Sequence, residues 1–388
     1  MNRLRILFYV PSQTFADPNH KELTERLAQC LSDRIDVQLV VSTDKKTSTA
    51  PADYDLIHIF GCWSISACQL ARKAYVQHTP YPLTPLGALQ PWEGERHRRT
   101  PLYKRQRIVT EKAAAVQVCG QLEQTTFLKL NWNRRVALIK NPVLTSLTTF
   151  EEAANQLLLL YRKVLDSYAR VILDDSTRQL IGNLLQVGLD DEALDDADRR
   201  QALIAVLSSL SDEEWRRISL YASEEGISLI IEAAVKRLGL DKPMVDVTQI
   251  DRFKGSTTYS TNNLRGDILL SRNLLLRNKV KETFAEHGAT EQSVSLQLLN
   301  LHYELSHHAA PLLHLANLYH TMRYTDMDED MIRDMARDLD ILDFAERLMA
   351  VMHHFLGLTE GFMPFNSRDD KQARQLTAAF TKFDMYPV

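Results

Sequence analysis

The sequence contains little cysteine, and the cysteines it has are not arranged to hold a metal or a disulfide framework. Only four occur in 388 residues, with no CxxC pair and no histidine at zinc-finger spacing: Cys30, Cys62, Cys68 and Cys119. Isolated thiols of this kind are typical of a reducing compartment, where free cysteine packs as a small apolar residue. We therefore expect a cytoplasmic protein with free thiols.

Long apolar runs and an excess of positive charge are also missing. The run Leu157–Tyr161 is far shorter than the ~20 residues that a membrane-spanning helix needs. Leu4–Val10 is too short for the apolar core of a signal peptide, so we interpret it as a buried strand. A net charge of −4 gives no electrostatic reason to expect nucleic acid. We predict a soluble protein that does not bind nucleic acid.

Up to about residue 147, short apolar runs alternate with amphipathic stretches. Apolar residues on consecutive positions, rather than alternate ones, favour strands that are buried on both faces. Strands that alternate with helices predict βαβ units and a parallel sheet. The predicted strands are Leu4–Val10, Val37–Ser42, Leu56–Phe60, Tyr81–Thr84, Val116–Cys119 and Val136–Lys140, and the predicted helices are His20–Ser32, Ser64–Gln77, Gly94–Ala114 and Gln121–Leu130.

After Asn141-Pro142 the pattern becomes mostly helical. Thr149 with Glu152, and Ser211 with Glu214, are capping-box patterns that begin helices. Only Met244–Ile250 and Asp267–Leu270 look strand-like, and 253–267 has the composition of a long loop. The predicted helices cover 149–173, 176–188, 198–209, 211–222, 226–238, 268–286, 291–322, 328–357 and 370–382.

These patterns predict an α/β fold: a Rossmann-like parallel sheet in an N-terminal domain, followed by a mostly α-helical C-terminal region. We place the N-terminal domain at residues 1–147 and the helical region, whose role the sequence does not indicate, at 148–388. Ligands of an open parallel sheet gather at the carboxyl ends of its strands. Gly61 and Gly87 each follow a predicted strand, where a glycine permits positive φ or close approach of a ligand.

Four segments of the N-terminal domain resemble motifs of the family 4 glycosyltransferases. Asp53–Ser64 (DYDLIHIFGCWS) is similar to the family's D-hydrophobic-hydrophobic-H-x-H-G-x-W-S segment. Tyr81–Trp92 (YPLTPLGALQPW) is similar to P-Y-hydrophobic-hydrophobic-S-P-H-G-M-L-E-P-W. Glu111–Gly120 (EKAAAVQVCG) resembles E-R-A-A-A-V-x-A-T-S, and Val136–Val143 (VALIKNPV) resembles V-x-V-I-P-N-G-V. The segments follow one another in the family's order over residues 1–145.

The resemblance implies the acceptor-side half of a GT-B enzyme, which transfers a sugar from a nucleotide donor to a polysaccharide or lipid-linked acceptor. It implies no cofactor besides the nucleotide sugar. The expected substrate-binding residues follow the strands or lie just beyond them: Gly61, Trp63, Gly87, Trp92, Arg96 and Arg99. Trp63 and Trp92 also have a purely structural interpretation as loop wedges, which we favour for Trp63. No catalytic residue is assigned.

The chain departs from the family pattern at two places that matter for catalysis. Leu86 stands where the family has a histidine thought to act near the donor sugar and phosphate. The first strand runs into Pro11 and Ser12 rather than into a glycine-rich turn, so phosphate-binding amides are not arranged there. His58 matches a family histidine, but it lies within a predicted strand, and we interpret it as a core residue.

A donor-binding half is not recognisable after residue 148. Ser223–Ala234 (SEEGISLIIEAA) resembles the family's donor-site segment, and Glu224 and Glu232 have its E-x7-E spacing, but the glycine then follows the wrong glutamate. We interpret this segment as an amphipathic helix. Three alternatives stay open: a divergent glycosyltransferase, half of a split enzyme, or a noncatalytic binding or scaffold protein whose helical region contacts a partner protein.

Residues 94–112 carry seven lysines and arginines against Glu95 and Glu111. A solvated helix face is one interpretation. The other is contact with anionic lipid or with a polyprenyl-phosphate acceptor, the latter being what the resemblance implies, and it would place the protein at the inner face of the membrane.

Histidines are frequent between residues 302 and 320, but they lack the i, i+4 spacing of a zinc helix. Position 306, four residues after His302, is a serine. We therefore predict packing or surface roles and no metal site: His302, His307, His308, His314 and His320.

Overall fold

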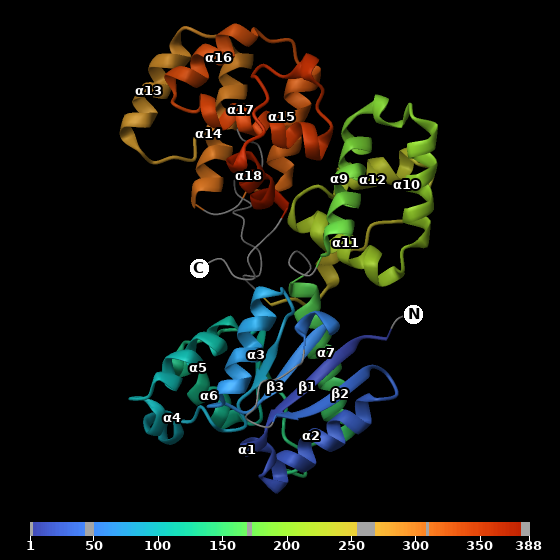
Figure 1. Cartoon of the computed structure of the whole chain (residues 1–388), viewed down its shortest axis with the longest axis vertical. Helices are drawn as coiled ribbons and strands as arrows, with labels where there is room; N and C mark the ends of the chain where they lie inside the picture. Colours follow the sequence, from blue (N-terminus) through green and yellow to red (C-terminus); the bar gives the residue numbers. More distant parts are fainter. Residues whose placement is uncertain (1–2, 43–49, 169–172, 254–267, 308–309, 382–388) are drawn as a thin grey trace. The chain divides into compact units, whose positions relative to one another are not determined.

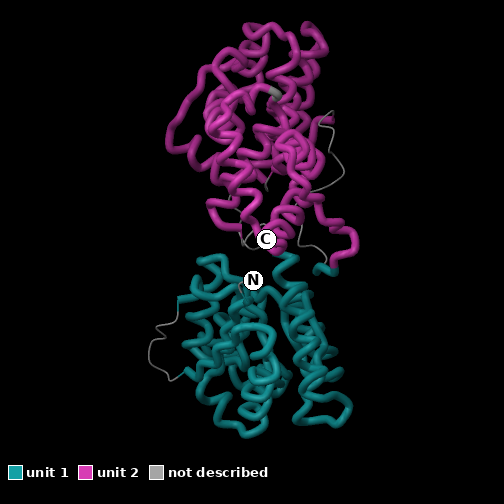
Figure 2. The backbone as a smooth tube through the Cα atoms, turned by 90° about the vertical axis from the view of Figure 1, so that its right-hand side faces the viewer, with its two compact units in different colours: residues 1–168, 251–256, 388 teal, residues 169–250, 257–387 magenta. Residues whose placement is uncertain are grey.

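The computed structural model describes residues 3–42, 50–168, 173–253, 268–307 and 310–381 (Figure 1). Within this range the chain forms two compact units, which Figure 2 shows in different colours. Unit 1 comprises residues 3–168 with the short return 251–253, and unit 2 comprises the remainder. Unit 1 extends beyond residue 147 because it includes α7 (Phe150–Ser167).

Unit 1 is built on a six-stranded sheet in which every neighbouring pair of strands is parallel. The strand order is β2-β1-β3-β4-β5-β6, so the chain reverses direction across the sheet between β1 and β3. The predicted α/β fold with a parallel sheet is therefore confirmed. The strands are β1 (Arg5–Pro11), β2 (Asp36–Ser42), β3 (Leu56–Phe60), β4 (Pro82–Thr84), β5 (Ala115–Val118) and β6 (Val136–Leu138).

Helices cover both faces of this sheet (Figure 1). Leu7, Tyr9, Ile57 and Ile59 point to the face that packs against α3 (Ile65–Val76), α5 (Pro101–Lys112) and α6 (Gln121–Leu130). The other face, which includes His58, packs against α7, with α2 (Pro18–Leu31) beside it. Burial on both faces explains why the strands read as continuous apolar runs.

The single helix predicted over Gly94–Ala114 is wrong. The structure has two helices there, α4 (Pro91–His97) and α5, separated at residues 98–100. Pro101 begins α5, and the residue before it, Thr100, is extended with φ −95° and ψ 151°. Proline is favoured at the first helical position and disfavours helical backbone in the residue before it. A short helix that was not predicted, α1 (Ser12–Phe15), follows β1.

Unit 2 is helical, and its described residues contain no strand. The strand expected at Met244–Ile250 is wrong, since that segment contains the 3-10 turn Val247–Gln249. Residues 268–270 are not a strand either, and Asp267 lies outside the described residues. The helices are α9 (Asp175–Leu189), α10 (Ala197–Ser209), α11 (Asp212–Glu224), α12 (Ser228–Arg237), α13 (Leu274–Ala285), α14 (Ala289–His307), α15 (Leu312–Tyr324), α16 (Glu329–Asp338), α17 (Leu342–Val351) and α18 (Lys371–Thr381).

Two long helices predicted in unit 2 are each divided. Residues 291–322 form parts of α14 and α15, and Pro311 is the N-cap of α15. Residues 328–357 are interrupted after α16, where Asp340 has φ +58°, a left-handed conformation that ends a helix. The predicted mostly helical region is confirmed, whereas these helix boundaries are not.

The chain leaves unit 1 at the amino edge of the sheet. The Tyr168 hydroxyl, just after α7, donates to the carbonyl of Ala114, which precedes β5 (3.3 Å). The returning Phe253 amide donates to Ser167 Oγ (2.8 Å), and Lys163 pairs with Asp251. Within unit 1, Tyr168 and the return 251–253 are thus held near the edge opposite the carboxyl ends of the strands.

Candidate functional site

Gly61 and Gly87 lie at the same edge of the sheet. Gly61 directly follows β3, and Gly87 comes three residues after β4 ends at Thr84. The Gly61 amide donates to the Thr84 carbonyl (2.7 Å), which joins the two strand ends. Both glycines have positive φ, +83° and +81°. The carboxyl edge of β1, β3, β4 and β5 is therefore the region where a ligand of this fold is expected.

The backbone at Gly61 is in close contact with the segment after β1. A Cβ atom at position 61 would lie 2.3 Å from Thr14 Oγ1, so only glycine fits. Gln13 Nε2 donates to the carbonyls of Cys62 (3.4 Å) and Trp63 (3.2 Å). The turn after β1 is thus packed onto the turn after β3, at the point where the strand order reverses. A glycine at position 61 is required by this packing.

Gly87, in contrast, is open. It is half-buried, and a Cβ atom added there would meet no other atom within 4 Å. Leu86, the residue in place of the family histidine, precedes it with φ +55°. Of the two glycines, Gly87 is the one that leaves space at the edge of the sheet.

Glu123 is a residue that our sequence interpretation missed. It lies in the first turn of α6, directly beyond β5, and its carboxylate joins two strand ends. Oε1 accepts the Gly87 amide and Oε2 accepts the Cys119 amide, each at 2.6 Å. An acid three residues into a helix that begins after a buried strand was the available signal, because a carboxylate there favours the helix dipole.

The environment of Glu123 raises its pKa on balance. Burial raises the pKa of this carboxyl, while the hydrogen bonds from Cys119 and Gly87 and the nearby His20 lower it in part. His20 lies in the first turn of α2, which follows β1 and α1, so residues after β1, β4 and β5 come together here. An acid held at strand ends with a raised pKa is a feature of functional sites, and also of structural clamps.

Trp63 is buried and holds loops together. Its indole Nε1 donates to the Ala88 carbonyl (2.7 Å), and its amide donates to Gln106 Oε1 (2.9 Å). Its ring stacks on His97 of α4, with centroids 4.3 Å apart. These contacts tie the turn after β3 to the turn after β4 and agree with the structural interpretation. A ligand does not meet the face of a ring already stacked in this way.

Trp92, Arg96 and Arg99 lie away from the two glycines along α4 and just after it. All three side chains are exposed, and Arg96 pairs with Glu93 (2.8 Å). The structure therefore groups the six predicted residues into two sets. Gly61, Trp63 and Gly87 belong to connected turns at the sheet edge, whereas Trp92, Arg96 and Arg99 are exposed on α4 and just after it.

His58 is a satisfied core residue, as predicted. It is fully buried, and its ring nitrogens contact the Tyr161 hydroxyl and Thr84 Oγ1, each at 2.7 Å. Because the Thr84 hydroxyl donates to Gln117 Oε1 (2.8 Å), Thr84 Oγ1 accepts a hydrogen bond from His58 Nε2–H, and His58 Nδ1 accepts one from the Tyr161 hydroxyl. Burial lowers the pKa of His58 to about 3, so the imidazole is neutral at physiological pH.

The segment of unit 2 that resembles a donor site lacks the required surroundings. It runs from the end of α11 into α12, with no strand before or after it. Glu225 is fully buried, and its carboxylate accepts the Leu312 amide (2.8 Å) at the first turn of α15. Glu232 is exposed on α12. This segment is helical, as predicted, and Glu225 has a structural role.

The histidines of unit 2 have separate neighbours. His314 pairs with Glu304 (2.7 Å), His307 contacts the Tyr303 carbonyl (2.8 Å), and His302 packs against the Phe344 ring. His308 lies outside the described residues. Across residues 3–42, 50–168, 173–253, 268–307 and 310–381, no three His, Cys, Asp or Glu side chains are grouped to hold a metal ion.

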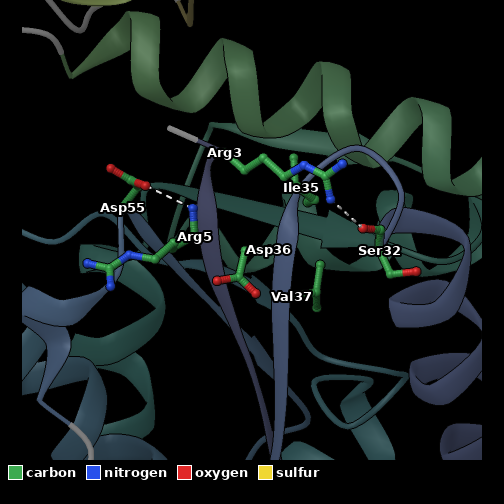
Figure 3. Close-up of a pocket in the computed structure, with 7 residues that line it drawn as sticks. All are labelled: Arg3, Arg5, Ser32, Ile35, Asp36, Val37 and Asp55. Carbon is green, nitrogen blue, oxygen red and sulfur yellow. Dashed lines mark hydrogen bonds between the residues drawn. The ribbon is translucent and has the colours of Figure 1, made fainter. Parts of the chain in front are cut away.

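A polar pocket of about 710 Å³ opens at the amino edge of the unit 1 sheet (Figure 3). Arg3 and Arg5 supply positive charge there, and Asp36 and Asp55 supply negative charge. The Asp55 carboxylate accepts the Arg5 amide (2.9 Å), which joins the beginnings of β1 and β3. Gly61 and Gly87 are not part of this pocket, and a mixed-charge opening of this kind specifies no ligand.

Comparison with known proteins does not assign a class. No family model matches the chain, and neither a curated protein nor a solved structure matches it. The helices in the described part of the chain are all too short or too polar to cross a bilayer. The fold and the carboxyl-edge residues are therefore the basis for a functional proposal.

Proposed function

We propose that the protein is a glycosyltransferase-like glycan-binding protein. In this proposal the carboxyl edge of unit 1 contacts a polysaccharide or lipid-linked glycan, and the chain by itself does not transfer sugar from a nucleotide donor. The motif resemblance of residues 1–145 supports the glycan as ligand, and the strand order supports the edge of the sheet as the place of contact.

The main support for the noncatalytic part of the proposal is the helical character of unit 2. A GT-B donor site needs a second parallel sheet, with helix N-termini at its strand ends to stabilise the donor diphosphate. The described residues of unit 2 contain helices and turns but no strand. A donor site of that construction has no framework in residues 173–250 and 268–381.

The amides at the edge of unit 1 give a second line of support. The Gly87 and Cys119 N–H groups, which could otherwise meet a phosphate, both donate to Glu123. Leu86 offers no imidazole. A glycan, by contrast, can use an uncharged hydrogen-bonding group such as the exposed side chain of Gln121.

A donor-hydrolysis assay tests the noncatalytic part. The purified full chain is incubated with UDP-sugars and GDP-sugars, and the released nucleotide is measured. We expect no release above a protein-free control. Turnover of any donor that increases in proportion to the concentration of the chain would contradict the proposal.

Binding to a glycan array tests the ligand class. We expect the chain to bind selected polysaccharides and Gln121→Ala to weaken that binding about fivefold, since a lost hydrogen bond costs about 1 kcal/mol. Gln29→Ala is the matched control, because Gln29 is exposed on α2 away from the carboxyl edge. Equal losses for the two variants, or no binding to any glycan, would reject the sheet edge as a glycan site.

A split transferase is the second candidate function. Large apolar side chains are exposed where α3 and α6 begin and in the turn after β6, namely Ile65, Leu122 and Leu144. A donor-binding domain on another chain would cover such residues. The test is whether an α/β chain that copurifies with the protein hydrolyses nucleotide sugar faster in its presence, and an unchanged rate would exclude this candidate.

A further inference from the structure

The outer faces of α4 and α5 carry cations beside two exposed apolar side chains. Trp92 and Arg96 are spaced i, i+4 on α4 and so share a face of that helix, and Arg99 is exposed in the turn that follows it. On α5, Lys104 and Ile108 share the exposed face. Trp92 is 60% exposed and Ile108 is 56% exposed. Single exposed apolar residues are ordinary, but these two lie on helices that also carry exposed lysines and arginines.

This surface has a charge opposite to that of the whole chain. Residues 91–110 have a net charge of +4, whereas the chain has −4. Three of the cations have a carboxylate partner three or four residues away: Arg96 pairs with Glu93, Arg98 with Glu95, and Arg107 with Glu111. Within the described residues, the remaining cations have no carboxylate partner: Arg99, Lys104 and Arg105.

The fold does not require these outward side chains. The inner face of α5 is held by buried Gln106, Val109 and Thr110. The end of α4 is held by the stack of His97 on Trp63. The outer surface of α4–α5, consisting of Trp92, Arg96, Arg99, Lys104, Arg105 and Ile108, is therefore available for another molecule without loss of the core.

We propose that the outer surface of α4–α5 binds an anionic lipid bilayer. Its cations complement the negative surface potential of such a membrane, where each lysine or arginine contributes about 1 kcal/mol. The indole of Trp92 suits the headgroup region, which accepts an amphipathic ring, and Ile108 adds apolar contact. This contact does not depend on the proposed glycan binding, because none of its residues lies in the turns of Gly61 and Gly87.

Vesicle cosedimentation of the full chain tests the proposal. The vesicles consist of phosphatidylcholine alone or of phosphatidylcholine mixed with phosphatidylglycerol. We expect binding to the anionic vesicles only, weakened by added salt. The variant Arg99→Ala/Lys104→Ala/Arg105→Ala loses about fivefold in affinity per charge, on the order of a hundredfold in total. Lys129→Ala/Lys236→Ala/Lys281→Ala, which removes three exposed cations elsewhere, is the charge-matched control and retains binding.

Tryptophan emission gives a readout that does not depend on the charge variants. We expect a blue shift when anionic vesicles are added, and no shift in Trp92→Phe, which keeps an apolar ring at the surface. Equal binding to neutral vesicles, equal losses for the two triple variants, or a shift that persists in Trp92→Phe would each overturn the proposal. Binding to soluble polyanions but not to vesicles would overturn it as well, and would indicate an acidic macromolecule as the partner.

Discussion

The two units bury their polar groups in different ways. In unit 1 a continuous hydrogen-bonded series runs from Tyr161 through His58 and Thr84 to Gln117, crossing β3, β4 and β5. In unit 2 the buried carboxylate of Glu225 caps the beginning of another helix. Parallel strands bring distant residues to one edge, whereas helix packing distributes polar groups among separate helix ends. A shared ligand site is therefore expected in unit 1.

The largest loss of stability that we predict is for a substitution at Gly61 in unit 1. Gly61→Ala is strained by φ +83° and brings a methyl group within 2.3 Å of Thr14 Oγ1. Strain of about 1–2 kcal/mol and overpacking of about 1–3 kcal/mol together lower the free energy of unfolding by about 4 kcal/mol. Urea unfolding in a Trp215→Phe background measures this, since the remaining tryptophans are all in unit 1.

Thr14→Ala in the same background provides the control. It removes the oxygen and the methyl group nearest to the added atom, so the double variant should be more stable than Gly61→Ala alone. No recovery of stability would mean that backbone strain, and not the contact between the β1 and β3 turns, determines the cost.

A pH effect of about 3 kcal/mol is expected from His58. Burial lowers its folded pKa to about 3, below the unfolded value of about 6.5. Below pH 6.5 the unfolded chain binds a proton that the folded chain does not, so stability falls by about 1.4 kcal/mol per pH unit, reaching about 3 kcal/mol near pH 4.5. Unfolding of unit 1 in urea at several pH values measures the slope.

His58→Gln removes this titration while keeping groups that can bond Tyr161 and Thr84. The difference in the free energy of unfolding between the natural chain and this variant should therefore change by about 1.4 kcal/mol per pH unit below pH 6.5. Parallel pH curves for the two proteins would show that His58 is not held neutral, and that the buried series in unit 1 is open to water.

For unit 2 we predict that Glu225→Ala lowers the free energy of unfolding by about 2 kcal/mol. Glu225→Ala leaves the buried Leu312 amide without this acceptor, and a lost bond to a carboxylate costs about 1.5–3 kcal/mol. Hydrogen exchange followed by mass spectrometry should show faster exchange in peptides of α11 and α15 and unchanged exchange in β1 and β3. Faster exchange in both units would contradict the independence of their polar groups.

The smallest predicted effect is at Gly87. Gly87→Ala meets no atom within 4 Å, so only the strain of φ +81° remains, about 1 kcal/mol. Thermal unfolding compared with Gly61→Ala measures the difference between the two glycines. A cost as large as that at Gly61 would mean that the turn of Gly87 is not open.

Much of unit 1 could be predicted from the sequence. The six strands were located within one or two residues, because strands buried on both faces give continuous apolar runs. The break at residues 98–100 was missed although Pro101 signalled it. In unit 2, helical periodicity continued across Pro311 and Asp340, so the predicted helices were too long.

The candidate site was harder to predict than the fold. Both glycines were identified, but their different roles depend on Thr14, which is distant in the sequence. The contact of Glu123 with the Gly87 amide could not be predicted, because Gly87 follows a different strand and precedes Glu123 by 36 residues. The segment Glu111–Gly120, which resembles a family motif, ends three residues before Glu123.

The carboxylate of Glu123 has a consequence for work with this protein in solution. The Glu123 carboxylate already accepts hydrogen bonds from the Gly87 and Cys119 amides. Acetate, sulfate or inorganic phosphate from a buffer therefore has to displace this carboxylate before it can bind to the two amides. Because Glu123 belongs to the same chain as the two amides, its carboxylate is always present there at high effective concentration. In thermal-shift screens, buffer anions should therefore not raise the melting temperature by binding to these two amides.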